Sequence, residues 1–245
     1  MNNQLKTINL SSNEEKVIVY DFETKVDETN IDLGENSHLI YITMDLGHTE
    51  DAINQVKANL KKDAYLEIYN IITSDKNCKI KQAIYLNEGN AKVEVMNLLL
   101  LTKEANLEST IEIFHKEKAT TSNLSNYVIA KDKATTLLNN NAKIEKSCSK
   151  SNAHQQTKGL TLSANAKIKA LPNLYIDEYD VIANHACSIG SINKEDLFYL
   201  MSRGMSQEEA SKIIVMGYVK PILDHIKDEA LKAKIDASFA TYLLN

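Results

Sequence analysis

Two side chains in the last third of the sequence have the chemistry of metal ligands. His185 and Cys187 lie two positions apart in the stretch formed by residues 183–190. Imidazole and thiolate are both ligands for iron, and residues i and i+2 of a strand point to the same face. The pair therefore predicts a metal or cofactor site. The competing interpretation, which residue types alone favour, is a histidine at the end of a fold beside a small core cysteine.

The remaining reactive side chains indicate less chemistry. We expect His154 to be a turn histidine bonded to the backbone, and Cys78 and Cys148 to be ordinary, partly exposed thiols in polar stretches. The sequence has no HExxH motif, no glycine-rich phosphate loop and no GxxxxGK[ST] motif. Because no nucleophile, base and acid occur together in a known arrangement, the sequence does not predict an enzyme.

Composition limits the classes of function. The 245 residues carry a formal charge of −5, so there is no basic excess for binding nucleic-acid phosphates. The three cysteines are odd in number and lack CxxC spacing, which argues against a zinc ribbon or a disulfide framework and favours a reduced, cytoplasmic compartment. We see neither a signal peptide nor an apolar run of roughly 18 residues, so no membrane association is expected.

Helices must follow the His185–Cys187 pair. Asn193 is placed to cap a first helix and Gly204 to end it, and Ser206 with Glu209 has the spacing of a capping box for a second helix that Gly217 ends. Further along, Pro221 opens or kinks a helix and Asp228 caps a last one. Apolar stripes accompany these helices: Leu197, Phe198, Leu200 and Met201; Ala210, Ile213 and Ile214; and Leu231, Ile235, Phe239, Tyr242 and Leu243.

A loose repeat precedes the pair. In each copy a polar residue precedes an alanine, after which apolar and charged residues alternate. The alanines, at positions 64, 91, 105, 142 and 166, are unevenly spaced, which fits an irregular parallel β-solenoid better than a β-sandwich. Alternation predicts these core residues: Leu66, Ile68, Val93, Val95, Leu107, Ile111, Ile113, Ile144 and Ile168.

The predicted organisation is a flexible N-terminus over residues 1–15, a β-helix core over 16–190 and a C-terminal helical subdomain over 191–245. First strands are expected at residues 17–22 and 38–46. Residues 49–62 are ambiguous, because their periodicity slightly favours a helix. The apolar run 98–101 is either buried on both faces or part of an interface.

The helical stretch and the pair together resemble one family. In order and at matching spacing, the chain has His185, Ile189-Gly190, Glu195-Asp196, Leu197-Phe198-Tyr199, Ser202-Arg203-Gly204 and Glu208-Glu209-Ala210. This pattern resembles the C-terminal signature of the SufB/SufD family of iron–sulfur cluster assembly proteins. Residues 153–156 and 160–163 are closer to the SufD version, and 172–176 continue the match. The resemblance is sharp over about residues 150–225.

The resemblance implies a right-handed parallel β-helix, which favours a strand at 49–62. It implies that the β-helix pairs with a SufB/SufD-type chain or with itself, and that an iron–sulfur cluster is held transiently, in a complex, near His185. It also implies that the C-terminal helices dock a SufC-type ABC ATPase. The residues assigned to partner binding are Glu195, Asp196, Leu197, Phe198, Tyr199, Met201, Arg203, Glu208, Ile213, Met216 and Tyr218.

The chain departs from the family pattern near the pair. SufB has a glutamate directly after its histidine, where Ala186 stands here, and a ligand cysteine near 155–158, where none occurs. Cys187 falls where the family usually has a small residue, and Ala183 where SufD often has cysteine. Two alternatives therefore stay open: a metal-free β-solenoid interaction protein, and a self-sufficient homodimeric scaffold. A polysaccharide-active β-helix enzyme is disfavoured, since no aspartates recur at rung spacing.

Overall fold

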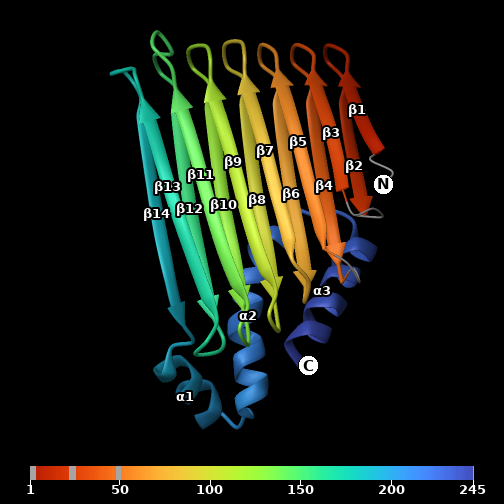
Figure 1. The fold of residues 1–245 in the computed structure, drawn as a ribbon, viewed down its shortest axis with the longest axis vertical. Helices are drawn as coiled ribbons and strands as arrows, with labels where there is room; N and C mark the ends of the chain where they lie inside the picture. Colours follow the sequence, from red (N-terminus) through yellow and green to blue (C-terminus); the bar gives the residue numbers. More distant parts are fainter. Residues whose placement is uncertain (1–3, 22–25, 48–50, 245) are drawn as a thin grey trace.

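The computed structural model describes residues 4–21, 26–47 and 51–244. Over these ranges the chain forms fourteen strands followed by three helices (Figure 1). Odd-numbered strands form one sheet and even-numbered strands a second, and neighbouring strands in each sheet are parallel. Each pair of consecutive strands is thus one rung of a β-solenoid, which confirms the predicted fold class.

Short turns, the corners of the solenoid, separate consecutive strands within each described range. The strands are β1 Gln4–Leu10, β2 Glu15–Asp21, β3 Val26–Leu33, β4 His38–Leu46, β5 Ala52–Leu60, β6 Tyr65–Ser74, β7 Cys78–Leu86, β8 Lys92–Leu101, β9 Asn106–His115, β10 Thr121–Ala130, β11 Thr135–Ile144, β12 Asn152–Thr161, β13 Lys167–Ile176 and β14 Ile182–Ser191. The helices are α1 Lys194–Ser202, α2 Gln207–Leu223 and α3 Glu229–Leu244.

The polar–alanine repeat marks corners of the solenoid. Ala64 and Ala91 each donate a backbone N–H to the carbonyl three residues earlier, and each follows a residue with positive φ, Asp63 or Asn90. Both alanines are fully buried, because only a small side chain fits beneath so tight a turn. The exception is Ala142, which lies inside β11 rather than at a corner.

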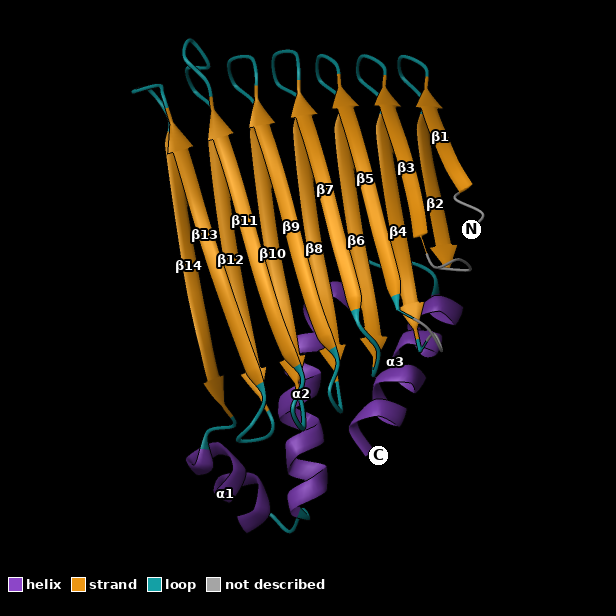
Figure 2. Cartoon of the chain, viewed as in Figure 1, coloured by secondary structure: helices purple, strands orange, loops and turns teal. Residues whose placement is uncertain are grey.

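The solenoid core and a second core under the helices are separate. Eight of the nine predicted core residues are buried, and Ile168 is partly buried because it belongs to the last rung. The apolar run in β8 is buried on both faces: Leu99 and Leu101 point into the solenoid, and Leu98 and Leu100 contact the helices. The helices α2 and α3 cover the outer face of the even-numbered sheet (Figure 2).

Most of the predicted helix ends are confirmed. Asn193 caps α1, Ser206 and Glu209 form the capping box of α2, and the Asp228 carboxylate accepts backbone N–H groups at the start of α3. The prediction that Gly217 ends the second helix is wrong, since α2 continues to Leu223 with Pro221 inside it. Pro221 removes one backbone hydrogen bond of α2, and the buried residues on either side of Gly217, Val215 and Val219, hold the helix against the core.

Two stretches near the start of the chain are strands. Residues 4–10, within the segment predicted to be flexible, form β1, which pairs with β3 and buries Leu10. The strand that the resemblance favours within 49–62 is confirmed, against the helical periodicity: β5 covers Ala52–Leu60, and residues 49 and 50 lie outside the described residues. The first predicted strand corresponds to β2, with Phe22 also outside them. For β1 and β5, pairing with neighbouring strands outweighs the polar or helical pattern of the local sequence.

A ladder of polar side chains runs inside the solenoid at one register position. Thr43, Asn70, Asn97, Asn126 and Thr157 come from successive even-numbered strands, and all are buried. The side-chain bonds between neighbours measure 2.8, 2.7, 2.6 and 3.2 Å in that order. We call these five residues the amide ladder. It satisfies buried polar groups that would otherwise destabilise the core.

The first corners leave no room for a side chain at Gly34. A Cβ there would lie 2.7 Å from the Ser12 backbone nitrogen and 2.9 Å from the Leu10 carbonyl oxygen. We therefore expect Gly34→Ala to lower the free energy of unfolding by about 1–3 kcal/mol, measured by urea denaturation. Gly190→Ala is the matched control, because nothing lies within 4 Å of its Cβ position. Equal losses in the two variants would contradict this prediction.

Candidate functional site

The candidate site lies at the open end of the solenoid. In β12 the inward-facing side chains are buried, because β14 stacks over them. In β14 the corresponding side chains are exposed, because after Ser191 the chain leaves the solenoid and enters α1 instead of adding another rung (Figure 1). The seventh rung therefore presents interior positions to solvent.

His185 and Cys187 occupy two of these interior positions. They pair in register with Gln155 and Thr157 of β12. Their parity matches that of Ile189, which points inward, since its side chain lies 3.0 Å from the Cβ position of buried Gly159. Both side chains are exposed, and they share one face, as alternation predicts. Both lie inside strand β14, before its end at Ser191.

Exposed apolar side chains share the last rung with the pair. Ile176 and Ile189 have the inward parity of the pair, whereas Leu171, Tyr175 and Ile182 alternate to the outer face. The exposed large hydrophobic residues of the last rung and its corner are Leu171, Tyr175, Ile176, Tyr179, Ile182 and Ile189. An exposed apolar patch of this kind is typical of a protein–protein contact. The open end thus combines two potential metal ligands with a surface suited to a second chain.

The other two thiols are not accessible. Cys78 and Cys148 are buried, so the expectation of partial exposure was wrong for both. Burial and the nearby Asp45 carboxylate raise the pKa of the Cys78 thiol to about 12, and burial also raises the pKa of Cys148. A thiol with a raised pKa is a poor nucleophile and a poor metal ligand at neutral pH.

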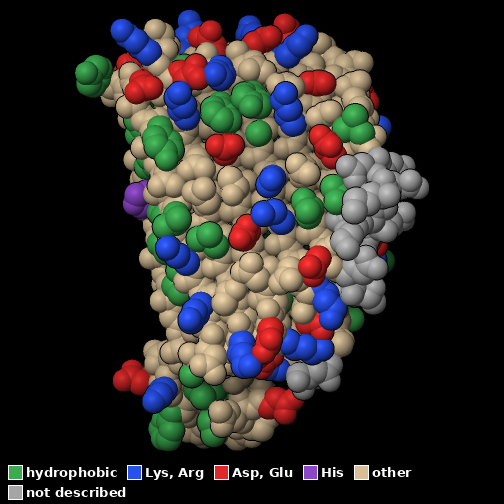
Figure 3. All heavy atoms as spheres, in the orientation of Figure 1, with side chains coloured by type: hydrophobic (Ala, Val, Ile, Leu, Met, Phe, Trp, Pro, Cys, Tyr) green, Lys and Arg blue, Asp and Glu red, His purple; other side chains and the backbone are tan. Residues whose placement is uncertain are grey.

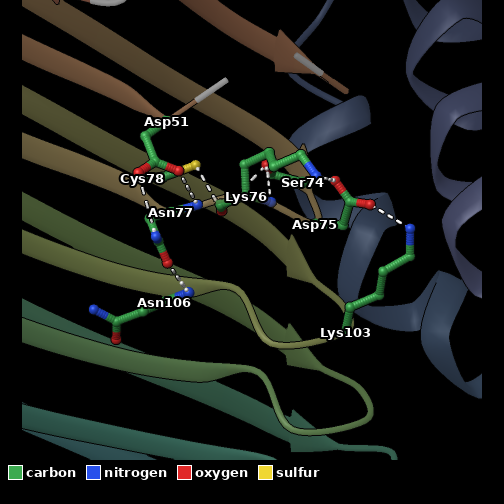
Figure 4. Close-up of polar contacts among 8 residues, drawn as sticks. All are labelled: Asp51, Ser74, Asp75, Lys76, Asn77, Cys78, Lys103 and Asn106. Carbon is green, nitrogen blue, oxygen red and sulfur yellow. Dashed lines mark hydrogen bonds and ion pairs between the residues drawn. The ribbon is translucent and has the colours of Figure 1, made fainter. Parts of the chain in front are cut away.

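Figure 4 shows the polar contacts of the corner at which Cys78 lies. Cys78 begins β7 at a corner where Asn77 donates to the Asp51 carboxylate and accepts from the Asn106 backbone N–H at 3.0 Å. Lys103 forms an ion pair with Asp75 beside it. These contacts join neighbouring rungs, and we assign this corner a structural role.

Two other histidines remain. The prediction for His154 was wrong, and His115 was not singled out from the sequence. His154 lies within β12, not in a turn, and its Nδ1 is 2.5 Å from the side-chain oxygen of Asn184. His115 is fully buried, with its ring nitrogens 2.8 and 2.9 Å from the hydroxyls of Thr120 and Ser122. Burial lowers the pKa of His115 to about 4, so the ring is neutral at physiological pH.

The helices provide a second exposed surface. On α1 no residue is buried, and Phe198, Tyr199 and Met201 have exposed fractions of 73%, 56% and 40%. Figure 3 shows hydrophobic side chains on the surface over α1. Arg203 lies against Tyr199, donating to its hydroxyl at 3.0 Å. This face is unusually apolar for a solvent-exposed helix.

The remaining residues predicted to bind a partner divide into two groups. Glu195, Asp196, Glu208 and Ile213 are exposed. Leu197, Met216 and Tyr218 are half-buried, and the last two pack against the core under the helices. A groove of about 390 Å³ on α2 is lined by residues including Ile213, Met216, Lys220 and Leu223.

The comparisons with known proteins agree with this architecture. The profile of the SUF system FeS cluster assembly SufBD core domain matches residues 7–218. The chain belongs to the SufBD core family. The match covers the solenoid from β1 onward together with α1 and most of α2, so both exposed surfaces lie within the SufBD core domain.

Curated relatives carry related names. An iron–sulfur cluster assembly protein SufD of Bacillus subtilis is 38% identical over 126 residues, which cover 51% of this chain and 29% of that protein. An iron–sulfur cluster assembly SufBD family protein of Pyrococcus horikoshii is 30% identical over 203 residues, covering 82% and 39%. SufD of Plasmodium falciparum is 28% identical over 233 residues, covering 90% and 16%. This SufBD core chain therefore spans well under half the length of these relatives.

Two kinds of feature are absent from the described residues. Within the described ranges, no group of three or more His, Cys, Asp and Glu side chains is arranged to hold a metal ion. In the same ranges, no helix of this SufBD core chain is long and apolar enough to cross a membrane. His185 and Cys187 are thus two potential ligands in one chain, fewer than the four that protein usually provides to a cluster.

Proposed function

We propose that this chain is a SufD-like component of the SUF iron–sulfur cluster assembly complex. Its open solenoid end pairs with a SufB/SufD-type chain or with a second copy of itself. Its C-terminal helices dock a SufC-type ABC ATPase. The cluster is cargo that is assembled in the complex and passed on.

The open end of the seventh rung carries this proposal. A second chain seated there would cover the exposed apolar side chains. It would also add metal ligands of its own beside His185 and Cys187. Because one chain offers only two ligands, a cluster at this position needs side chains from its partner. The complex, rather than the isolated chain, is therefore the form that binds the cluster.

The exposed face of α1 supports the docking of an ATPase. Two aromatic residues, Phe198 and Tyr199, are exposed on a helix that buries none of its own side chains. Aromatic residues are enriched at protein–protein interfaces. Acidic residues flank them in the first turn of α1, Glu195 and Asp196. In this complex the ATPase hydrolyses ATP, and the chain itself is not a catalyst. The complex is cytoplasmic and does not bind nucleic acid.

Co-expression tests the proposal. The chain is produced with a SufC-type ATPase, with and without a SufB-type chain, and the complexes are measured by size-exclusion chromatography with light scattering. We expect a stable complex containing the ATPase. If the chain pairs only with SufB, it is a heterodimeric component, and if it pairs with itself, it is a homodimeric scaffold. Failure to bind any of these proteins would overturn the proposal.

The docking surface gives a specific prediction. We expect Phe198→Ser to weaken binding of the ATPase by about 30-fold, the loss of about 2 kcal/mol typical of a hot-spot aromatic residue, measured by isothermal titration calorimetry. Val17→Ser is the control, because Val17 is comparably exposed, at 62%, but lies in the first rung. An unchanged affinity in Phe198→Ser would place the ATPase elsewhere.

A further inference from the structure

Gln155 has a buried acceptor with no partner. Its side chain is 4% exposed, and its Nε2 donates to the backbone carbonyl of Asn173 at 3.2 Å. This bond fixes the orientation of the carboxamide, because only the nitrogen can donate. The Oε1 atom is left without a hydrogen-bond partner among the described residues. It is one of several buried polar atoms of this kind among the described residues, and its position in the strand directly under β14 distinguishes it.

Thr157 has the complementary property, a donor with no acceptor. Its hydroxyl oxygen accepts from Asn126 Nδ2, which also lies 3.4 Å from the backbone carbonyl of Gln156. The carbonyl fixes the orientation of the Asn126 amide, so every amide of the ladder donates toward the open end. Thr157 is 3% exposed, and no acceptor for its hydroxyl hydrogen is found in the described part of the chain.

Both groups lie directly beneath the candidate ligands. Gln155 pairs in register with His185, and Thr157 with Cys187, on neighbouring parallel strands. Neighbouring strands are about 4.8 Å apart, which is within reach of a hydrogen bond between inward-facing side chains. One rung thus presents an acceptor beneath an imidazole and a donor beneath a sulfur.

We propose that Gln155 and Thr157 are positioning residues for the ligands above them. In the metal-bound state Gln155 Oε1 accepts the N–H of the His185 ring, a bond not formed in this structure, and leaves the other ring nitrogen for the metal. The Thr157 hydroxyl donates to the sulfur of Cys187. Partners of this kind fix the tautomer of a ligating histidine and tune a metal–sulfur site. The inference rests on the ligand role in the proposed function and adds the two residues that orient it.

Cobalt(II) titration of the full chain in the complex obtained by co-expression tests this inference. The part of the thiolate-to-cobalt absorption band that Cys187→Ser removes reports on Cys187. We expect Gln155→Leu to weaken cobalt binding by about tenfold or more. We expect Thr157→Val to shift the band and Thr157→Ser to restore it. Gln156→Leu is the matched control, because Gln156 neighbours Gln155 but is exposed on the outer face.

Thermal unfolding separates positioning from structure. Gln155→Leu removes the unpaired acceptor, which stabilises the fold, and also the bond to the Asn173 carbonyl, which destabilises it. Because the two effects oppose each other, its unfolding midpoint should stay close to that of Gln156→Leu even though its cobalt affinity falls. If both properties fall together, the role of Gln155 is structural and the inference is wrong.

The outcomes also separate this inference from the proposed function. If His185→Ala and Cys187→Ser abolish the cobalt band but Gln155→Leu and Thr157→Val bind as tightly as the native chain, the ligands stand and the positioning role is overturned. If the native chain gives no band that depends on Cys187, both the ligand role and the positioning role are overturned. The ATPase and pairing parts of the proposal are then decided by co-purification alone.

Discussion

Asn97→Ala is expected to lower the free energy of unfolding by about 3 kcal/mol. Asn97 is fully buried at the centre of the amide ladder, where it accepts from Asn70 at 2.7 Å and donates to Asn126 at 2.6 Å. Alanine removes both bonds and leaves one buried donor and one buried acceptor unpaired, each costing about 1–3 kcal/mol. Chemical denaturation monitored by circular dichroism would measure the loss.

Asn123→Ala is the control for this substitution. Asn123 is the same residue type on β10 but faces outward and is only half-buried. We expect its loss to stay below about 0.5 kcal/mol, as is usual for surface positions. If the two variants lose similar stability, buried water satisfies the broken ladder and its bonds matter less than the geometry indicates.

The second large effect is acid destabilisation through His115. Its pKa is about 4 in the folded chain, against an ordinary value near 6.5, because burial disfavours the charged ring. The unfolded chain therefore binds the proton first, and stability falls as pH drops from about 6.5 toward 4. The shift corresponds to about 3 kcal/mol lost across that window and none above it.

His115→Gln isolates this contribution. The variant cannot titrate at this position, so its unfolding free energy should depend less steeply on pH between 6.5 and 4 than that of the native chain. Carboxylates titrate in the same window in both proteins, and their effect cancels in the comparison. His225→Gln, at an exposed histidine, is the matched control for the substitution itself. Parallel slopes for His115→Gln and the native chain would show that His115 does not control acid stability.

Local patterns were sufficient for much of the fold. Alternation along 92–95 and 107–113 predicts inward residues correctly, because a solenoid rung obeys the period of a single strand. The caps at Asn193 and Ser206 were also readable, since capping is a contact between residues close in sequence. Strand β1 was missed because its stability comes from pairing with β3, about twenty residues away.

The site was only partly predictable for a related reason. The types and spacing of His185 and Cys187 identify them as potential ligands, but spacing does not place Gln155 and Thr157 beneath them. Successive bonds of the amide ladder join residues 27, 27, 29 and 31 positions apart, because the corners differ in length. Without a constant period, the contacts between rungs emerge only from the three-dimensional register. Burial of Cys78 was missed for the same reason.

The open end of the solenoid also bears on how stability is distributed along the molecule. In a stacked array each unit is stabilised mainly by its nearest neighbours, and a terminal unit has only one. Strand β14 pairs with β12 alone, so it lies at the weakly coupled end of a cooperative series. A partner seated on this end would act as the missing neighbour. Association would then stiffen the strand that carries the candidate ligands, and dissociation would loosen it, linking retention of the cargo to the state of the assembly.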